Sequence, residues 1–251
     1  MGALHAGHLS LVRAAKAQCP AVAVSIFVNP TQFGPAEDFS KYPRTFEKDC
    51  ALLEEEGVDI VFAPSVEEMY PKDAATWVTV EDLSQKLDGR SRPGHFRGVT
   101  TVVAKLFHVV EPDRAYFGQK DAAQVAIIKR MVRDLKFGVE IVVGPIVRES
   151  DGLAMSSRNV YLNAAERQQA LVLHRTLLEM EKQFRAGKST GEILEAGKAI
   201  LASEPGARLD YLEIVDPETL DQMDRPAGGL AAIAAYVGAT RLIDNLLLAP
   251  R

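Results

Sequence analysis

The sequence has little cysteine, no long apolar run and no excess of basic charge. Cys19 and Cys50 are the only cysteines in 251 residues. Secreted domains that depend on disulfides usually carry a denser cysteine framework, so we expect two reduced thiols and a cytoplasmic protein. No apolar stretch approaches the roughly 20 residues that a membrane-spanning helix needs, so we expect no membrane partner.

The overall charge is slightly acidic. Lysine and arginine number 29 against 34 aspartate and glutamate residues, and the formal net charge is −5. Nucleic-acid-binding domains usually present a broad basic face, so we expect no nucleic-acid partner. The contents of 47% hydrophobic and 25% charged residues are ordinary for a globular chain. A chain of this length is expected to form one large domain or two smaller ones.

The first part of the chain alternates short apolar runs with amphipathic stretches. Apolar runs of strand length lie at 21–28, 58–62, 115–117 and 139–143. Helical patterns lie at 43–56, 99–110 and 121–135. This alternation predicts an α/β domain with a Rossmann-like parallel sheet over residues 1–146.

The pattern changes after about residue 145. Asn163 with Glu166, and Ser189 with Glu192, have the spacing of capping boxes, and each pair opens a helical pattern. Strand-like segments follow at 209–215, 230–237 and 241–248. We therefore predict a second, smaller α+β domain over residues 147–251.

Two histidines stand at the start of an amphipathic stretch, in His5-Ala6-Gly7-His8. A helix N-terminus carries unpaired N–H groups and a partial positive charge that attract anions, and imidazoles add further donors. The pair is a candidate anion site, with two solvated or capping histidines as the alternative. A zinc site needs at least three protein ligands, and no third candidate is near in sequence, so we assign no metal ligand. His108 and His174 lie on apolar helical faces, and we expect both to be structural.

Two further segments carry cationic and hydroxyl side chains. Phe117-Gly-Gln-Lys120-Asp121 joins a predicted strand to a predicted helix, at the edge where open α/β sheets bind ligands. Ser150 to Asn159 combines a glycine, hydroxyls and Arg158. Both segments suit a polyphosphate, whereas an ordinary solvated turn and a polar linker are the alternatives.

In combination these segments resemble the pantothenate synthetase family. The matching motifs are Met1-Gly-Ala-Leu-His5-Ala-Gly-His8, Ser25-Ile-Phe-Val-Asn29-Pro-Thr-Gln32-Phe, Tyr42-Pro-Arg-Thr, Arg92-Pro-Gly-His-Phe-Arg-Gly98, Phe117-Gly-Gln-Lys120-Asp121, Gly152-Leu-Ala-Met-Ser156-Ser157-Arg158-Asn159 and Arg241-Leu-Ile-Asp-Asn245. They cover nearly the whole chain. The H-x-G-H and M-S-S-R elements resemble the signatures of the wider nucleotidyltransferase superfamily.

The resemblance implies an ATP-dependent ligase. Pantoate would attack ATP to give pantoyl adenylate and pyrophosphate, and beta-alanine would then displace AMP to give pantothenate. By similarity, His5, His8 and Lys120 are catalytic, and His8 is the proton donor. Gln32 and Gln124 match pantoate-binding positions, and Gln32 also matches a beta-alanine-binding position. The ATP-binding positions are Met1, Gly2, Ala3, Leu4, His5, Ala6, Gly7, His8, Gly118, Gln119, Lys120, Asp121, Val147, Met155, Ser156, Ser157 and Arg158.

The resemblance also implies Mg²⁺ carried with ATP and a homodimer. Family members have a strand and a helix ahead of the position of Met1, so we expect the 251-residue chain to lack its first strand and to fold poorly. Two alternative functions stay open at this point. One is another adenylate-forming nucleotidyltransferase, and the other is an inactive nucleotide-binding remnant.

Overall fold

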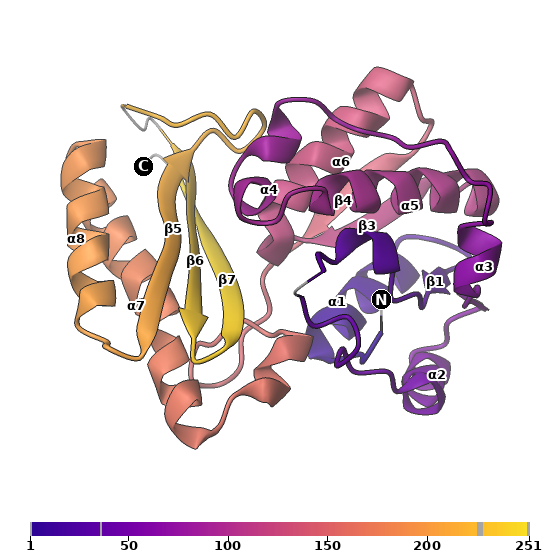
Figure 1. The fold of residues 1–251 in the computed structure, drawn as a ribbon, viewed down its shortest axis with the longest axis horizontal. Helices are drawn as coiled ribbons and strands as arrows, with labels where there is room; N and C mark the ends of the chain where they lie inside the picture. The colour runs from indigo at the N-terminus through magenta and orange to yellow at the C-terminus, as the bar shows by residue number, and fades with distance from the viewer. Residues whose placement is uncertain (1, 36, 225–227, 250–251) are drawn as a thin grey trace. The chain divides into compact units, whose positions relative to one another are not determined.

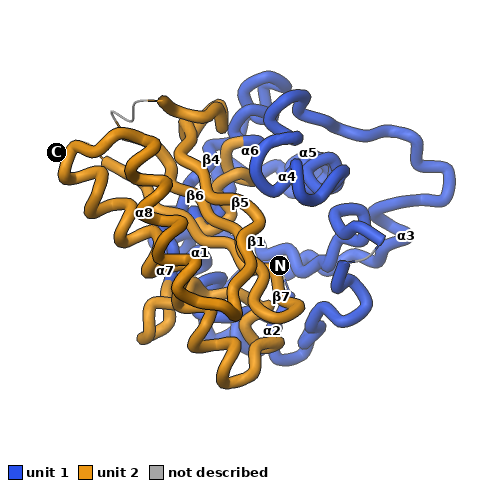
Figure 2. The backbone as a smooth tube through the Cα atoms, turned by 60° about the vertical axis from the view of Figure 1, so that its left-hand side comes forward, with its two compact units in different colours: residues 1–119, 127–147 blue, residues 120–126, 148–251 orange. Residues whose placement is uncertain are grey.

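The computed structural model describes residues 2–35, 37–224 and 228–249, and it divides into two compact units (Figure 2). Unit 1 comprises Met1–Gln119 and Ile127–Val147, and unit 2 comprises Lys120–Ala126 and Arg148–Arg251. The short segment Lys120–Ala126 therefore groups with the C-terminal part of the chain. No helix within the described ranges combines the length and apolar composition that a membrane crossing requires.

Unit 1 contains two pairs of parallel strands (Figure 1). Strand β1 (Ala23–Ser25) pairs with β2 (Ile60–Phe62), and β3 (Arg114–Gly118) pairs with β4 (Glu140–Gly144). The prediction of an α/β fold with parallel strands is confirmed. Strand β1 is shorter than the apolar run 21–28, because hydrogen-bonded pairing extends only over the three residues opposite β2.

The helices of unit 1 include those that the hydrophobic pattern predicted and two short ones that it did not, Val66–Met69 and Asp88–Ser91. In chain order the helices are α1 (Ala6–Lys16), α2 (Phe46–Glu55), α3 (Val66–Met69), α4 (Asp88–Ser91), α5 (His95–Val110) and α6 (Ala122–Leu135), with 3₁₀ turns η1 (Pro30–Gln32), η2 (Leu83–Gln85) and η3 (Gln119–Asp121). Helix α6 begins in the part of the chain that belongs to unit 2. Helix α5 begins four residues before the pattern predicted, because Gly94 adopts a left-handed φ of 82° and turns the chain directly into the helix.

The core of unit 1 lies between α1, β1 and α2. It contains Leu4, Leu9, Val12, Ala15, Val22, Val24 and Leu53. An apolar cavity of about 170 Å³ lies beside this core, against the backbones of both β1 and β3. Its remaining walls come from α1 and α5, through side chains such as Leu11, Val12, Leu106 and Phe107.

Unit 2 is an antiparallel sheet covered on one side by two helices. The sheet order is β5 (Ala207–Val215), β6 (Gly229–Val237) and β7 (Thr240–Leu248). Helices α7 (Ala164–Arg185) and α8 (Thr190–Ala202) pack on it after the 3₁₀ turn η4 (Ser157–Tyr161). Both predicted capping boxes are present, at Asn163 with Glu166 and at Ser189 with Glu192.

A close helix contact fixes the packing of this second core. A Cβ at Gly197 of α8 would lie 2.9 Å from Met180 of α7, so only glycine permits the observed approach. Met180 and Ile193 are fully buried at this contact. The core continues across the sheet through alanine and isoleucine side chains of β6.

Candidate active site

The rings of the two N-terminal histidines contact each other at the start of α1, with an angle of 30° between their planes. Their ring centroids are 4.0 Å apart. His5 is the N-cap, and its Nδ1 accepts a hydrogen bond of 3.2 Å from the backbone N–H of Gly7. Nδ1 of His8 accepts a bond of 3.4 Å from the backbone N–H of His5. Since both Nδ1 atoms accept, each neutral ring carries its proton on Nε2, and both imidazoles become Nε2–H donors.

A buried carboxylate fixes the backbone just ahead of these histidines. Asp49 of α2 is 0% exposed and accepts hydrogen bonds from the backbone N–H groups of Ala3 (2.8 Å) and Leu4 (2.9 Å). The Thr45 hydroxyl donates a third bond of 2.9 Å to the same carboxylate. Ala3 itself has a left-handed φ of 49°. A conformation this unfavourable for alanine persists because Asp49 pairs the neighbouring N–H groups.

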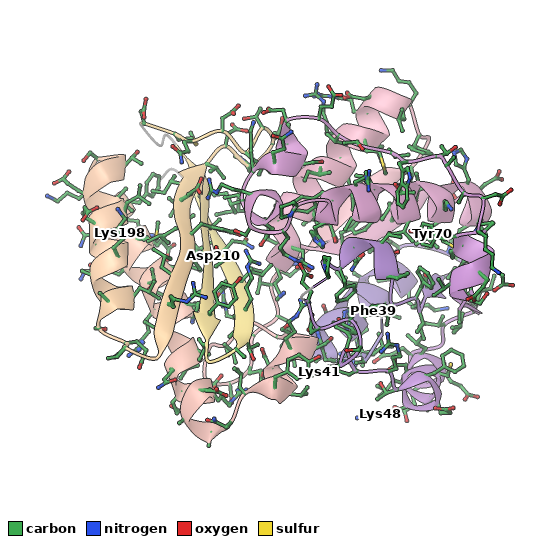
Figure 3. The ribbon with its side chains drawn as sticks, viewed as in Figure 1. Phe39, Lys41, Lys48, Tyr70, Lys198 and Asp210 are labelled. Carbon is green, nitrogen blue, oxygen red and sulfur yellow. The ribbon has the colours of Figure 1, made fainter. Side chains whose placement is uncertain are left out.

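Gln32 ends the 3₁₀ turn η1, and its side-chain amide is oriented by Asn29. Asn29 is 2% exposed, and its Nδ2 donates to Oε1 of Gln32 at 3.2 Å and to the carbonyl oxygen of Gly98 at 3.1 Å. The hydroxyl of Tyr70 donates to Oδ1 of Asn29 at 2.9 Å (Figure 3 labels Tyr70). With Oε1 engaged by Asn29, the Gln32 amide offers its Nε2 hydrogens to a ligand.

His95 and Arg92 hold the backbone of Gln32. Nη1 of Arg92 lies 3.1 Å from Nε2 of His95, and because a guanidinium can only donate, Nε2 must accept. His95 therefore carries its proton on Nδ1, which donates to the carbonyl oxygen of Gln32 at 2.8 Å. Burial, together with the Arg92 charge, lowers the pKa of His95 to about 4. Arg92 also forms a two-point ion pair with Glu37, at 2.9 and 2.5 Å.

The turn that carries Lys120 lies at the start of unit 2. Nζ of Lys120 is 3.4 Å from Oδ1 of Asp121, and its side chain is 21% exposed. Its carbonyl oxygen accepts a hydrogen bond of 2.9 Å from Nδ2 of Asn245 on β7. Gln124 follows on the first turn of α6 and is half-buried.

The segment with Met155, Ser156, Ser157 and Arg158 is held by a network of ion pairs. Arg167 of α7 contacts Glu149 and Asp151 at 2.7 Å each. Asn159 donates to Glu149 at 2.8 Å and to the carbonyl oxygen of Ala154 at 3.1 Å. The Ser156 hydroxyl caps η4 by accepting from the N–H of Arg158 at 3.2 Å. The segment is therefore a turn fixed by ion pairs and hydrogen bonds.

The predicted site residues are divided between the two units. Unit 1 holds Gly2, Ala3, Leu4, His5, Ala6, Gly7, His8, Gln32, Gly118, Gln119 and Val147, whereas unit 2 holds Lys120, Asp121, Gln124, Met155, Ser156, Ser157 and Arg158. Met1 lies outside the described residues. Among the residues that the structure describes, no group of three or more His, Cys, Asp or Glu side chains is arranged to hold a metal ion.

Sequence reasoning assigned no role to three buried polar side chains. Asp49 lies four residues before the buried Leu53, on the apolar face of α2, but this spacing alone does not identify it, because a carboxylate in an amphipathic helix is usually solvated. Asp244 and Asn245 interrupt the apolar pattern of a predicted strand, and both are 3% exposed. His108, which we expected to be structural on an apolar helix face, has an exposed side chain at the end of α5, where its ring centroid lies 5.3 Å from that of Phe137.

Comparison with known proteins gives a consistent result. The model of the family described as pantoate-beta-alanine ligase matches residues 1–247. A pantothenate synthetase of Acidobacterium capsulatum is 70% identical over 250 residues, which are 99% of this chain and 84% of that protein. A pantothenate synthetase of Koribacter versatilis is 64% identical, over 99% of this chain and 86% of that protein.

Two solved structures share the fold. Pantothenate synthetase from Thermus thermophilus superposes with a TM-score of 0.97 at 54% identity, over 100% of this chain and 91% of that chain. A pantoate-beta-alanine ligase from Francisella tularensis, in complex with beta-gamma ATP and beta-alanine, gives a TM-score of 0.81 at 34% identity. That match covers 99% of this chain and 87% of that chain.

Proposed function

The chain belongs to the pantoate-beta-alanine ligase family, and from this premise we propose that it joins pantoate to beta-alanine with ATP. The pantoate carboxylate attacks the α-phosphorus of ATP, an acyl-phosphate bond forms and pyrophosphate leaves. The amine of beta-alanine then attacks the acyl carbon of pantoyl adenylate, an amide bond forms and AMP leaves. The contacting His5 and His8 pair at the N-terminus of α1 is the observation that carries this proposal.

His5 and His8 supply donors for the charge that develops on the phosphate during adenylation. Both rings have their proton on Nε2, because both Nδ1 atoms accept backbone N–H bonds. The positive end of the α1 dipole adds to their effect. A fixed donor aimed at developing charge typically contributes about 3–4 kcal/mol to lowering the barrier. We assign His8 as the Nε2–H hydrogen-bond donor to the departing pyrophosphate, and His5 as an additional phosphate donor.

Lys120, Ser156, Ser157 and Arg158 would bind the polyphosphate from unit 2. Lys120 supplies a point charge, and the guanidinium of Arg158 provides a planar fork that matches two phosphate oxygens. The serines add neutral donors. Gly2, Ala3, Leu4, Ala6, Gly7, Gly118, Gln119, Asp121, Val147 and Met155 would line the rest of the nucleotide site, as would Met1.

Gln32 and Gln124 would select pantoate. The Gln32 amide has Oε1 bound to Asn29, so its Nε2 hydrogens are directed to acceptor atoms of pantoate, and the same group would contact beta-alanine. A site built to pair with substrate hydroxyls can reject an analogue that lacks them by about 10⁴ to 10⁵. Gln124, on the first turn of α6, would make the second pantoate contact.

Three further properties belong to the same proposal. Mg²⁺ would enter as part of the MgATP substrate, held mainly by phosphate oxygens and water. The protein would act as a homodimer in the cytoplasm, as its family membership and two cysteines suggest.

The test is exchange of labelled pyrophosphate into ATP, measured with and without pantoate. We expect exchange only when pantoate is present, followed by stoichiometric AMP release once beta-alanine is added. Exchange that proceeds equally well without pantoate would contradict the assigned substrate and favour a different adenylate-forming reaction. ATP binding without any exchange would contradict the enzymatic function.

A further inference from the structure

Two adjacent polar residues lie in the middle of strand β7 of unit 2. Asp244 and Asn245 are each 3% exposed, and their neighbours along the strand are leucine and isoleucine. Burying a carboxylate and an amide is unfavourable unless each finds strong partners. Because successive side chains of a strand point to opposite faces, the two residues contact different segments of unit 2.

Asp244 anchors the turn that leads to the serine and arginine segment. Its carboxylate pairs with Arg148 through two bonds, of 2.7 and 3.0 Å. Nη1 of Arg148 also donates to the carbonyl oxygen of Gly152 at 3.1 Å. Arg148 forms an isolated β-bridge with Ala154, immediately before Met155. The ion pair with Asp244 therefore fixes Arg148, and Arg148 in turn contacts Gly152 and Ala154, just before Ser156.

Asn245 anchors the segment that carries Lys120. Its Nδ2 donates to the backbone carbonyl oxygen of Lys120 at 2.9 Å, across 125 residues of sequence. The backbone N–H of Asn245 donates to Oδ1 of Asp244 at 2.8 Å, so the two anchors are linked to each other. This contact agrees with the grouping of Lys120–Ala126 in unit 2, although β3 immediately before it belongs to unit 1.

We propose that Asp244 and Asn245 are positioning residues that hold Lys120 and the Ser156 to Arg158 segment in one fixed arrangement for adenylation. This inference rests on the proposed function of those segments as the polyphosphate site. Donors that are already in place need no reorganisation as charge develops on the phosphates. We call them positioning residues because Asp244 acts through Arg148 and Asn245 through the backbone of Lys120.

The test compares Asn245→Leu with a matched control, Asp210→Asn. The Leu variant keeps the number and branching of the side-chain heavy atoms and cannot donate to Lys120. Asp210 lies at the irregularity of β5 in the same sheet and pairs with Arg241 of β7 at 2.7 Å (Figure 3 labels Asp210). This ion pair involves neither Lys120 nor residues 148–159. Asn245→Leu removes a hydrogen bond of β7 and Asp210→Asn removes the charge of an ion pair of β7, but only the first loses an anchor of the proposed site.

We expect Asn245→Leu to lower kcat of pantoate-dependent pyrophosphate exchange 10- to 100-fold, with the KM for beta-alanine within twofold of wild type. Asp210→Asn should keep wild-type exchange. Arg148→Lys, which retains the charge but loses the two-point geometry, should raise the KM for ATP about tenfold. If Asn245→Leu does not fold, Asn245→Ser takes its place, with a smaller loss of the same kind expected.

Two results would overturn the inference while leaving the proposed function intact. The first is an active wild-type enzyme whose Asn245 variants exchange pyrophosphate within threefold of its rate. The second is an Asp210→Asn variant that loses as much exchange as Asn245→Leu, which would show a general effect of sheet stability. Absence of exchange in the wild type would instead overturn the proposed function, and this inference with it.

Discussion

Lowering the pH should destabilise unit 1 through His95. This side chain is held neutral between Arg92 and the carbonyl oxygen of Gln32, and burial with the Arg92 charge lowers its pKa from 6.5 to about 4. Below pH 6.5 the unfolded chain binds a proton that the folded chain does not take up until about pH 4. The free energy of unfolding therefore falls as the pH is lowered through this range.

The size of the effect follows from the difference between the two pKa values. A difference of about 2.5 units corresponds to about 3 kcal/mol when the pH has fallen below both values. At pH 5 the expected loss is about 2 kcal/mol, because the unfolded imidazole is already charged and the folded one is still neutral. Asp88 and Glu37 are the carboxylates that oppose this effect, and Arg92 reinforces it.

The assay is urea unfolding followed by tryptophan fluorescence at pH 7.5 and at pH 5. Trp77 is the only tryptophan and lies in the same unit as His95, so its signal reports on that unit. The matched variant is His95→Asn, whose side-chain N–H can still donate to Gln32 but does not titrate. The carboxylates are the same in both proteins. The difference between the two proteins in how the free energy of unfolding changes with pH therefore isolates the contribution of His95.

The stability difference between wild type and His95→Asn should shrink by about 2 kcal/mol between pH 7.5 and pH 5. His108→Asn removes an exposed histidine from the same helix, and this control should follow the wild type at both pH values. A wild-type advantage over His95→Asn that is equal at the two pH values would refute the reasoning.

Two further substitutions test the site and its support. Gln32→Ala should raise the KM for pantoate at least tenfold and leave ATP binding unchanged, since it removes an oriented amide donor; steady-state kinetics with each substrate varied will check this. Gly152→Ala should lower the free energy of unfolding by about 1–3 kcal/mol, because Gly152 has a φ of +96° and a Cβ there would lie 2.6 Å from Nδ1 of His174. Chemical denaturation followed by circular dichroism measures that loss, and an unchanged midpoint would contradict the strain argument.

Much of the fold was predictable because its signals are local. The capping boxes at Asn163 and Ser189 mark the helix starts directly, and the apolar runs locate the strands to within a few residues. The separation of the parallel strands into two pairs was not predictable, since pairing is decided by contacts between segments distant in sequence. The grouping of Lys120 with unit 2 was not predictable for the same reason, because it depends on contacts with distant segments, such as the bond from Asn245.

The residues of the candidate site were predictable from the sequence, but the buried side chains that hold its backbone in place were not. His5, His8, Lys120 and Ser156 stand out through motif spacing. Asp49 does not, because a carboxylate in an amphipathic helix is usually solvated, and only the structure shows it bonded to the N–H groups of Ala3 and Leu4. Supporting residues of this kind act through backbone atoms, which leave no pattern in side-chain sequence.

The central claim is that the His5 and His8 pair performs adenylation of pantoate, and His8→Ala tests it most directly. Calorimetry should show ATP binding close to that of the wild type, whereas pantoate-dependent pyrophosphate exchange should fall at least 100-fold, as loss of about 3 kcal/mol of transition-state stabilisation requires. His108→Ala, at an exposed position, should retain full exchange. Near-normal exchange by the His8→Ala protein would contradict the account.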